Sequence, residues 1–213
     1  MIFFVFTRVS CEANGLVVTE PYTKLLLENA VQSLDVEDLY VDNQKTKYYP
    51  NNAGYLFPNL KVVHNERNSL EFVEKQNFEN MGKVTVITLA HNSISSVPAD
   101  AFDHLQSVRI IYLNNNILKG LDPYLCSKNP NLVDFFAFRN QLETLPQGLF
   151  DNNLELEGMH FDFNKLHRID ITFYDSRNYL RLNFNSNACI NKAIEDGKGK
   201  FDLIQEIRRN CQI

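Results

Sequence analysis

The sequence predicts an α/β solenoid, in which short coils stack side by side and each coil adds one strand to a parallel sheet. The first observation is a set of apolar positions that recurs at a fixed period, as from Val84 to Val108 and on to Leu132, with one shorter step near the end. Such a period is typical of stacked-repeat folds. The second is an amide side chain at the same place in successive copies, at Asn68, Asn92, Asn116, Asn140, Asn164 and Asn187.

The stretch VTVITLAHNSI shows the pattern within one copy. Its apolar residues and its Asn stand at spacings of three, two, three and two, namely at Val84, Ile87, Leu89, Asn92 and Ile94. One period further these positions hold Val108, Ile111, Leu113, Asn116 and Leu118. The first copy carries Gln44 in place of the Asn. We therefore expect about seven coils over residues 36–188.

The recurring Asn has a physical explanation. After each strand the chain must turn sharply away from the sheet, which leaves backbone N–H and C=O groups inside the coil without a ladder partner. An Asn side chain carries both a donor and an acceptor, so it can satisfy its own turn and that of a neighbouring coil. The six Asn residues are expected to stack in the interior.

These residues resemble the leucine-rich repeat, LxxLxLxxNxL, in its longer extracellular version. The second half of the repeat supports this, because VPADAFDHL and LPQGLFDNN resemble the LPxxxFxxL half-repeat of Toll-like and Slit-like ectodomains. The resemblance covers roughly residues 34–213. It implies a horseshoe with a concave parallel sheet, an irregular or short-helical convex side and a C-terminal helical cap.

The chain is expected to form one structural domain in three parts: an N-terminal flank and partial cap (1–35), the repeats (36–188) and a C-terminal cap (189–213). The start, MIFFVF, is short for a signal peptide. It is either a vestigial start or the first strand of the domain. RVSCEANGLVVTEP resembles the second half of the cap of small secreted insect leucine-rich repeat proteins. Because no cysteine precedes Cys11, we expect a truncated N-terminus and an unpaired Cys11.

The other cysteines divide between the cap and the core. Cys211 ends a predicted helix, KFDLIQEIRRN, whose apolar stripe comprises Phe201, Leu203, Ile204 and Ile207. A disulfide between Cys189 and Cys211 would tether this helix over the open end of the solenoid, and the alternative is two buried free thiols. Cys126 stands where sister repeats have Phe, which favours a buried core position over a reactive thiol.

No pattern indicates catalysis, a cofactor or a metal site. The sequence has no Gly-rich phosphate loop, no HExxH and no GxSxG. His64 and His160 share an outward position but lie four coils apart, roughly 19 Å at the usual strand spacing, so they cannot bind one ion. His160 and Asp162 provide only two ligands. The net charge of −5 with no basic stripe argues against nucleic acid, and no apolar run is long enough to span a bilayer.

Side chains alternate between the two faces of a strand, so residues flanked by core positions must point outward to the concave face. Thr88 is one such residue. Outward aromatic and neighbouring residues concentrate on adjacent strands and predict a partner-binding patch at Ile110, Tyr112, Asp134, Phe136, Phe138 and His160. The alternatives are plain strand propensity or a covering loop. Glu37, Asp38 and Asp42 form either a solvated face or a subsite for a basic ligand.

Two classes of function remain open. The first is a non-enzymatic recognition module, secreted or receptor-like, that binds a protein ligand, with or without glycans, on its concave face. The second is an intracellular, cytoplasmic scaffold or regulatory subunit. An oxidised Cys189–Cys211 pair favours the first, because disulfides persist in oxidising compartments. The absence of an Asn-x-Ser/Thr sequon gives no support to secretion, and the oligomeric state is left open.

Overall fold

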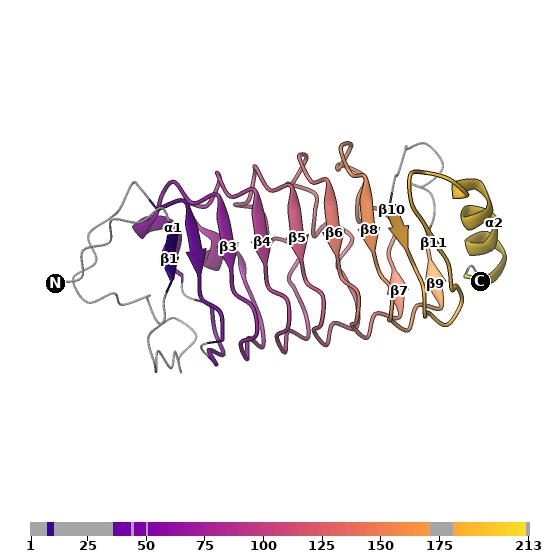
Figure 1. Ribbon diagram of the computed structural model, residues 1–213, viewed down its shortest axis with the longest axis horizontal. Coiled ribbons are helices and arrows are strands. Elements are labelled where there is room, and N and C mark those ends of the chain that lie inside the picture. Colours follow the sequence, from indigo (N-terminus) through magenta and orange to yellow (C-terminus); the bar gives the residue numbers. More distant parts are fainter. Residues whose placement is uncertain (1–7, 11–35, 44, 50, 171–180, 212–213) are drawn as a thin grey trace.

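The computed structural model describes residues 8–10, 36–43, 45–49, 51–170 and 181–211. The main sheet has nine strands in the order β1-β2-β3-β4-β5-β6-β8-β10-β11, and Figure 1 shows them side by side from one end of the molecule to the other. The strands are β1 (Arg8–Ser10), β2 (Asp38–Tyr40), β3 (Val62–His64), β4 (Val86–Thr88), β5 (Ile110–Tyr112), β6 (Asp134–Phe136), β8 (Gly158–His160), β10 (Arg181–Asn183) and β11 (Ala193–Ile194).

Strand register follows the sequence period. All pairings from β2 to β10 are parallel, and each residue pairs with its equivalent in the next repeat, as Asp38 does with Val62. The step between partners is constant until it shortens by one between Gly158 and Arg181. These seven strands confirm the predicted solenoid. Strand β1 pairs in parallel with β2 and extends the sheet. Cys11 and the other residues of the expected N-terminal part, apart from Arg8–Ser10, lie outside the described residues, so the domain boundaries stay a prediction.

Three residues beyond the end of each main-sheet strand from β3 to β10, the chain turns at a residue in the left-handed conformation. These residues directly precede the recurring Asn, and their φ values lie between 50° and 57°: Arg67, His91, Asn115, Arg139, Phe163 and Ser186. For a residue other than Gly, this conformation costs roughly 1–2 kcal/mol. The turn therefore needs stabilisation from elsewhere in the coil.

The recurring Asn supplies that stabilisation. Asn116 Nδ2 donates to the carbonyl oxygens of Leu113 in its own coil and of Leu89 in the preceding coil, both at 3.0 Å. Its Oδ1 accepts the Ile94 N–H at 3.0 Å. The same three kinds of bond recur at Asn92, Asn140, Asn164 and Asn187. Asn68, which is half-buried near the N-terminal end, bonds to the Val41 carbonyl.

A second, shorter Asn ladder runs through the side of the coils opposite the sheet. Asn129 donates to the carbonyls of Phe102 and Leu105, both at 2.9 Å, and Asn153 donates to those of Cys126 and Asn129 at 3.0 and 2.7 Å. Both side chains are fully buried. The spacing of the two Asn residues equals the repeat period and was available in the sequence, but two copies in a chain rich in Asn gave too weak a signal.

The return segments are irregular or briefly helical, as predicted. They include α1 (Ala53–Leu56), the 3₁₀ helix η1 (Lys75–Phe78) and a two-stranded sheet of β7 (Thr144–Leu145) and β9 (Arg168–Ile169). Phe78 and Phe102 pack with ring centroids 5.7 Å apart, and Phe150 is fully buried at the corresponding place. Cys126 is fully buried among these positions, which confirms its core placement, and burial raises the pKa of its thiol.

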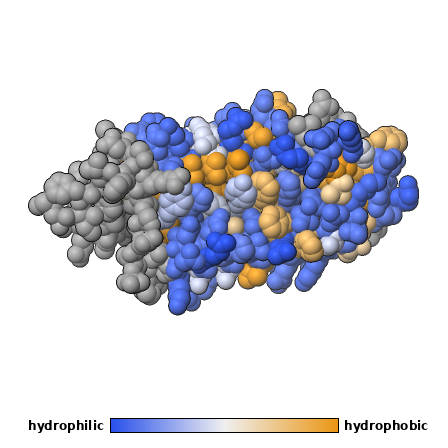
Figure 2. Space-filling view, in the orientation of Figure 1, coloured by the Kyte–Doolittle hydropathy of each residue, from blue (hydrophilic) through white to orange (hydrophobic). Residues whose placement is uncertain are grey.

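The outward face of the main sheet, here called the sheet face, consists of the side chains at the first and third position of each strand and at the second position beyond its end. Figure 2 shows this face in the orientation of Figure 1, with hydrophobic residues gathered over the middle strands and hydrophilic residues around them. The middle residue of each strand points the other way, and Ile87, Ile111 and Phe135 are fully buried.

The C-terminal end is closed by β11, which pairs antiparallel with β10, and by α2 (Lys200–Asn210). Within this helix the side chains of Leu203, Ile204 and Ile207 are buried. Phe201 is 72% exposed, so the prediction that it belongs to the apolar stripe was wrong. The reason is helical geometry: Phe201 precedes Ile207 by six positions, which at about 100° per residue places it on the flank of the stripe.

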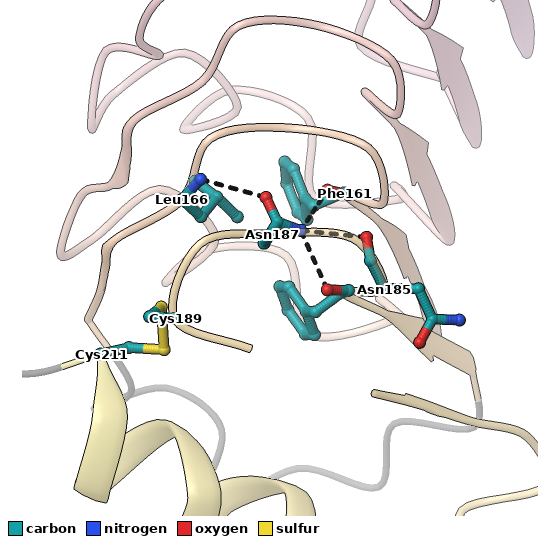
Figure 3. The surroundings of a disulfide bond; sticks show 7 residues. Phe161, Leu166, Asn185, Asn187, Cys189 and Cys211 are labelled. Carbon is teal, nitrogen blue, oxygen red and sulfur yellow. Dashed lines mark hydrogen bonds between the residues drawn. A yellow bond between two sulfur atoms is a disulfide. The ribbon is translucent and has the colours of Figure 1, made fainter. Parts of the chain in front are cut away.

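A disulfide joins Cys189 and Cys211, the pair that the sequence predicted, with Cα atoms 5.2 Å apart. Figure 3 shows the bond next to Asn187, the last rung of the ladder. The Cys189 N–H donates to the Leu166 carbonyl at 3.0 Å, and the Asn187 Oδ1 accepts the Leu166 N–H at 3.1 Å. The cap is therefore tied covalently and by hydrogen bonds to the last coils.

Replacing Asn116 with Leu should lower the free energy of unfolding by more than about 1 kcal/mol, because three buried backbone groups lose their partner. Equilibrium urea denaturation measures the loss. The control is Asn131→Ala, which removes an exposed side chain that donates to the Gln106 carbonyl and should change stability by less than about 0.5 kcal/mol. Equal effects of the two substitutions would contradict the stabilising role of the ladder.

Removing the disulfide by the double substitution Cys189→Ser and Cys211→Ser should lower stability by about 3 kcal/mol, since the bond closes a loop with a sequence separation of 22. Denaturation of the oxidised protein and of the double variant gives this difference. A reducing agent should have no effect on the double variant. If the two proteins unfold at the same denaturant concentration, the bond does not stabilise the cap.

Candidate partner-binding surface

Three rings from adjacent strands form a continuous stack on the sheet face. The centroids of Tyr112 and Phe136 are 4.5 Å apart with ring planes 12° from parallel, and those of Phe136 and His160 are 4.3 Å apart at 10°. The stack follows from the register, because these residues pair across β5, β6 and β8 and neighbouring strands are about 4.8 Å apart. The ring faces are turned toward one another, so the stack presents ring edges outward.

A second stack stands near the N-terminal end of the same row. Tyr40 on β2 and His64 on β3 have centroids 4.3 Å apart and planes 8° from parallel. Thr88 on β4 separates the two stacks. Thr88 points outward as predicted, but only 2% of its surface is exposed, and its hydroxyl donates to the Glu66 carboxylate at 2.8 Å. Thr88 points outward but is not exposed, because the longer Glu66 side chain contacts the short threonine.

Aliphatic side chains lie beside the rings. Val62, Val86 and Ile110 pair with one another at the first position of β3, β4 and β5, and all three are half-buried. Only Ile110 belonged to the predicted patch. Val62 and Val86 occupy the same strand position as Ile110 in the two preceding repeats, and this could have placed them in the predicted patch. Together with Tyr112 and Phe136 they form the hydrophobic centre of the sheet face (Figure 2).

Asp134 is engaged within the chain. The Arg181 guanidinium donates from Nη2 to Asp134 Oδ1 and Oδ2 at 3.0 and 3.2 Å and from Nε to Oδ1 at 3.3 Å, and it also contacts Glu157. The pair crosses β8 at Gly158, where an added Cβ would lie 1.8 Å from Asp134 Oδ1. The hydrogen bonds with Asp134 raise the pKa of Arg181. Asp134 can therefore meet a partner only as one half of this pair.

The C-terminal side of the patch is partly desolvated. Burial lowers the pKa of His160, which keeps the imidazole neutral near pH 7, and its Nε2 is buried with no hydrogen-bond partner among the described residues. Burial raises the pKa of Asp162. Phe138 is half-buried, and Phe163 in the adjoining turn is 50% exposed beneath the Arg139 guanidinium, 5.3 Å from its ring centroid. The sequence patch omitted this Arg–Phe pair.

The described residues hold no group of three or more His, Cys, Asp or Glu side chains placed to bind a metal ion. Among them, no helix is long and apolar enough to cross a membrane. The sheet face carries packed rings and aliphatic groups beside the Asp134–Arg181 ion pair.

The family model for "Leucine rich repeat" matches residues 58–118 and 85–142. This match covers the coils whose Asn ladder and strand register are described above. Residues 58–142 therefore carry leucine-rich repeats. The repeats are of the longer type, because hydrogen bonds such as that from the Glu66 N–H to the Asp42 carboxylate join neighbouring coils at a sequence separation of 24.

Curated leucine-rich repeat proteins show similarity over part of the chain. Prolargin from Mus musculus is 35% identical over 115 residues, which are 52% of this chain and 28% of prolargin. Lumican from Bos taurus is 26% identical over 154 residues, which are 69% of this chain and 42% of lumican. The chain thus spans little more than a quarter of the length of prolargin.

Solved structures of leucine-rich repeat ectodomains share the fold. In the Toll–Spatzle complex of Drosophila, one chain superposes with a TM-score of 0.64 at 25% identity, covering 72% of this chain and 24% of that chain. In the LRIM1/APL1C complex, the TM-score is 0.63 at 18% identity, covering 72% of this chain and 27% of that chain. The second likeness concerns the fold alone.

Neighbouring residues Phe135 and Phe136 should respond differently to truncation. Phe135→Ala should cost about 3–5 kcal/mol of stability, because the ring is fully buried against Phe150 and Phe161. Phe136→Ala should cost less, about 1–2 kcal/mol, from the loss of two ring stacks at a half-buried site. Chemical denaturation of both variants makes the comparison. Equal losses would contradict the assignment of the two faces.

Proposed function

We propose that this protein is a non-enzymatic recognition module that binds another protein on the sheet face, centred on Ile110, Tyr112, Phe136 and Phe138 with His160 and the Asp134–Arg181 pair at the margin. The observation that carries the proposal is the stack of Tyr112, Phe136 and His160 on adjacent strands, next to an aliphatic row. Clustered aromatic residues at a surface are typical of binding hot spots.

Ring orientation favours a protein partner over direct contact with a glycan. A sugar ring gains most when its apolar side lies flat against an aromatic face. In this stack the faces of Phe136 are covered by Tyr112 and His160, at 4.5 and 4.3 Å. The exposed ring edges suit apolar side chains and backbone carbonyl groups, since the edge of an aromatic ring carries partial positive charge.

An extracellular location is part of the proposal. The Cys189–Cys211 disulfide supports it, because such bonds are rare in the reducing cytosol. The similarity to prolargin, lumican and the Toll ectodomain supports it too. The chain in the Toll–Spatzle structure forms a complex with another protein, which favours protein binding here. An intracellular scaffold has less support for the same reasons.

The test is affinity capture from extracellular fluid of the source organism, with quantitative mass spectrometry of the retained proteins. The wild type and Phe136→Ala are compared with Tyr124→Ala, which truncates a 67% exposed aromatic residue on a return segment. Partners of the sheet face should be lost with Phe136→Ala, whose binding should weaken by about 2 kcal/mol or more, and be retained with Tyr124→Ala. Equal capture by all three proteins would exclude the sheet face as the binding site.

A further inference from the structure

The row of rings on the sheet face is interrupted at one position. From β2 to β8 the third strand position holds Tyr40, His64, Thr88, Tyr112, Phe136 and His160. Every neighbouring pair of rings in this row is stacked, at 4.3–4.5 Å between centroids. Thr88 alone has no ring, so one face of His64 and one face of Tyr112 are turned toward the threonine.

The distance between the rings of His64 and Tyr112, on either side of Thr88, would accommodate one planar group. His64 and Tyr112 lie two strands apart, which is roughly 9–10 Å at the usual strand spacing. A flat group placed midway would lie about 4.5–5 Å from each ring, which is close to the spacing within both stacks. Thr88 itself is covered by the Glu66 side chain, so a planar side chain of a partner would complete the row by resting on the Glu66 carboxylate between the two rings.

A carboxylate stands at this place. Glu66 Oε1 accepts the Thr88 hydroxyl at 2.8 Å, and Glu66 is one of the negative charges that raise the pKa of Tyr112, after burial and Asp134. The hydroxyl fixes the carboxylate without neutralising it, and its ion partner Arg67 is 3.5 Å away. Covering Glu66 with an uncharged ring would bury a charge whose ion partner is the exposed Arg67 side chain in the turn, whereas a cation of the partner would pair with it directly.

The rest of the sheet face also carries mainly negative charge. Five carboxylates lie on it, at Asp38, Asp42, Glu66, Asp134 and Asp162. Among the same positions of β2 to β10, the basic residue other than histidine is Arg181, which is engaged with Asp134 and Glu157. Arg67 and Arg139 lie beyond the face, in the turns. A positively charged partner is therefore attracted to the sheet face and to Glu66 within it.

We propose that the sheet face recognises an arginine of its protein partner, whose guanidinium stacks between His64 and Tyr112 above Thr88 and pairs with the Glu66 carboxylate. Arginine fits because its guanidinium is planar, stacks on aromatic faces and binds carboxylates through two parallel hydrogen bonds. A lysine would pair with Glu66 but could not stack as a plane. This inference rests on the proposed function, since the same sheet face must bind a protein.

The probe is a phage-displayed library of short random peptides, selected on the immobilised full chain and then measured as synthetic peptides by titration. Selected peptides that lose binding with Phe136→Ala should share an arginine. Replacing it with lysine, or with the neutral planar analogue citrulline, should weaken binding by about tenfold or more.

Two protein variants locate the arginine. Thr88→Phe fills the interrupted position and should abolish binding of the arginine peptides. Glu66→Gln should weaken them by about tenfold and make arginine and citrulline peptides bind alike. Glu79→Gln is the matched control, because Glu79 is an exposed carboxylate at the end of η1, away from the sheet face, and its loss should leave binding unchanged. Thermal melting verifies that each variant is folded.

The outcomes separate the two proposals. Peptides that depend on Phe136 but bind equally well with lysine or citrulline, or are unaffected by Glu66→Gln, would overturn the arginine inference and leave the proposed function standing. A selection that yields binders, none of which depends on Phe136, would overturn both proposals. Should Thr88→Phe fail to fold, Glu66→Gln decides the question by itself.

Discussion

The sharp left-handed turn at the end of each strand is the constraint on which the rest of the structure depends. A non-glycine residue occupies the turn in every repeat, from Arg67 to Ser186. The recurring Asn stabilises it by bonding to carbonyl groups in its own coil and in the preceding coil. Because these bonds connect successive coils, they hold equivalent positions of neighbouring repeats in register. The short strands alone, three residues each, could not set this register so firmly.

The register creates the sheet face. Side chains at equal positions of neighbouring strands are brought to the strand spacing, which is close to the preferred distance for stacked rings. Tyr112, Phe136 and His160 therefore stack without any further device. The same spacing places Asp134 and Arg181 two strands apart, and they meet only because Gly158 leaves the strand between them open. Residues that are one repeat apart in the sequence thus contact one another across neighbouring strands.

Much of the candidate site could be predicted because strand alternation is strict. Phe135 and Phe136 were assigned to opposite faces from their neighbours, and the structure buries one fully and the other by half. Strand alternation does not give the length and reach of side chains, and the helix stripe was assigned too widely. Thr88 points outward but is covered, Asp134 is held by Arg181 from far along the chain, and Phe201 lies outside the helix stripe to which it was assigned. The second ladder at Asn129 and Asn153 had only two copies, which is too few for a period to stand out.

The sequence by itself determined the solenoid, its register, the interior Asn positions and the cysteine pair that closes the C-terminal end. The solenoid, its register and the Asn positions depend on local periodicity, and every repeat carries the same pattern, so the signal accumulates along the chain. The cysteine pair follows instead from the need to close the open end of the solenoid. The tertiary structure alone decided the parallel stacking of rings, the ion pair across Gly158 and the gap between the two stacks at Thr88. Such features depend on distances and on coverage between side chains of different coils, and those are set only when the coils are packed.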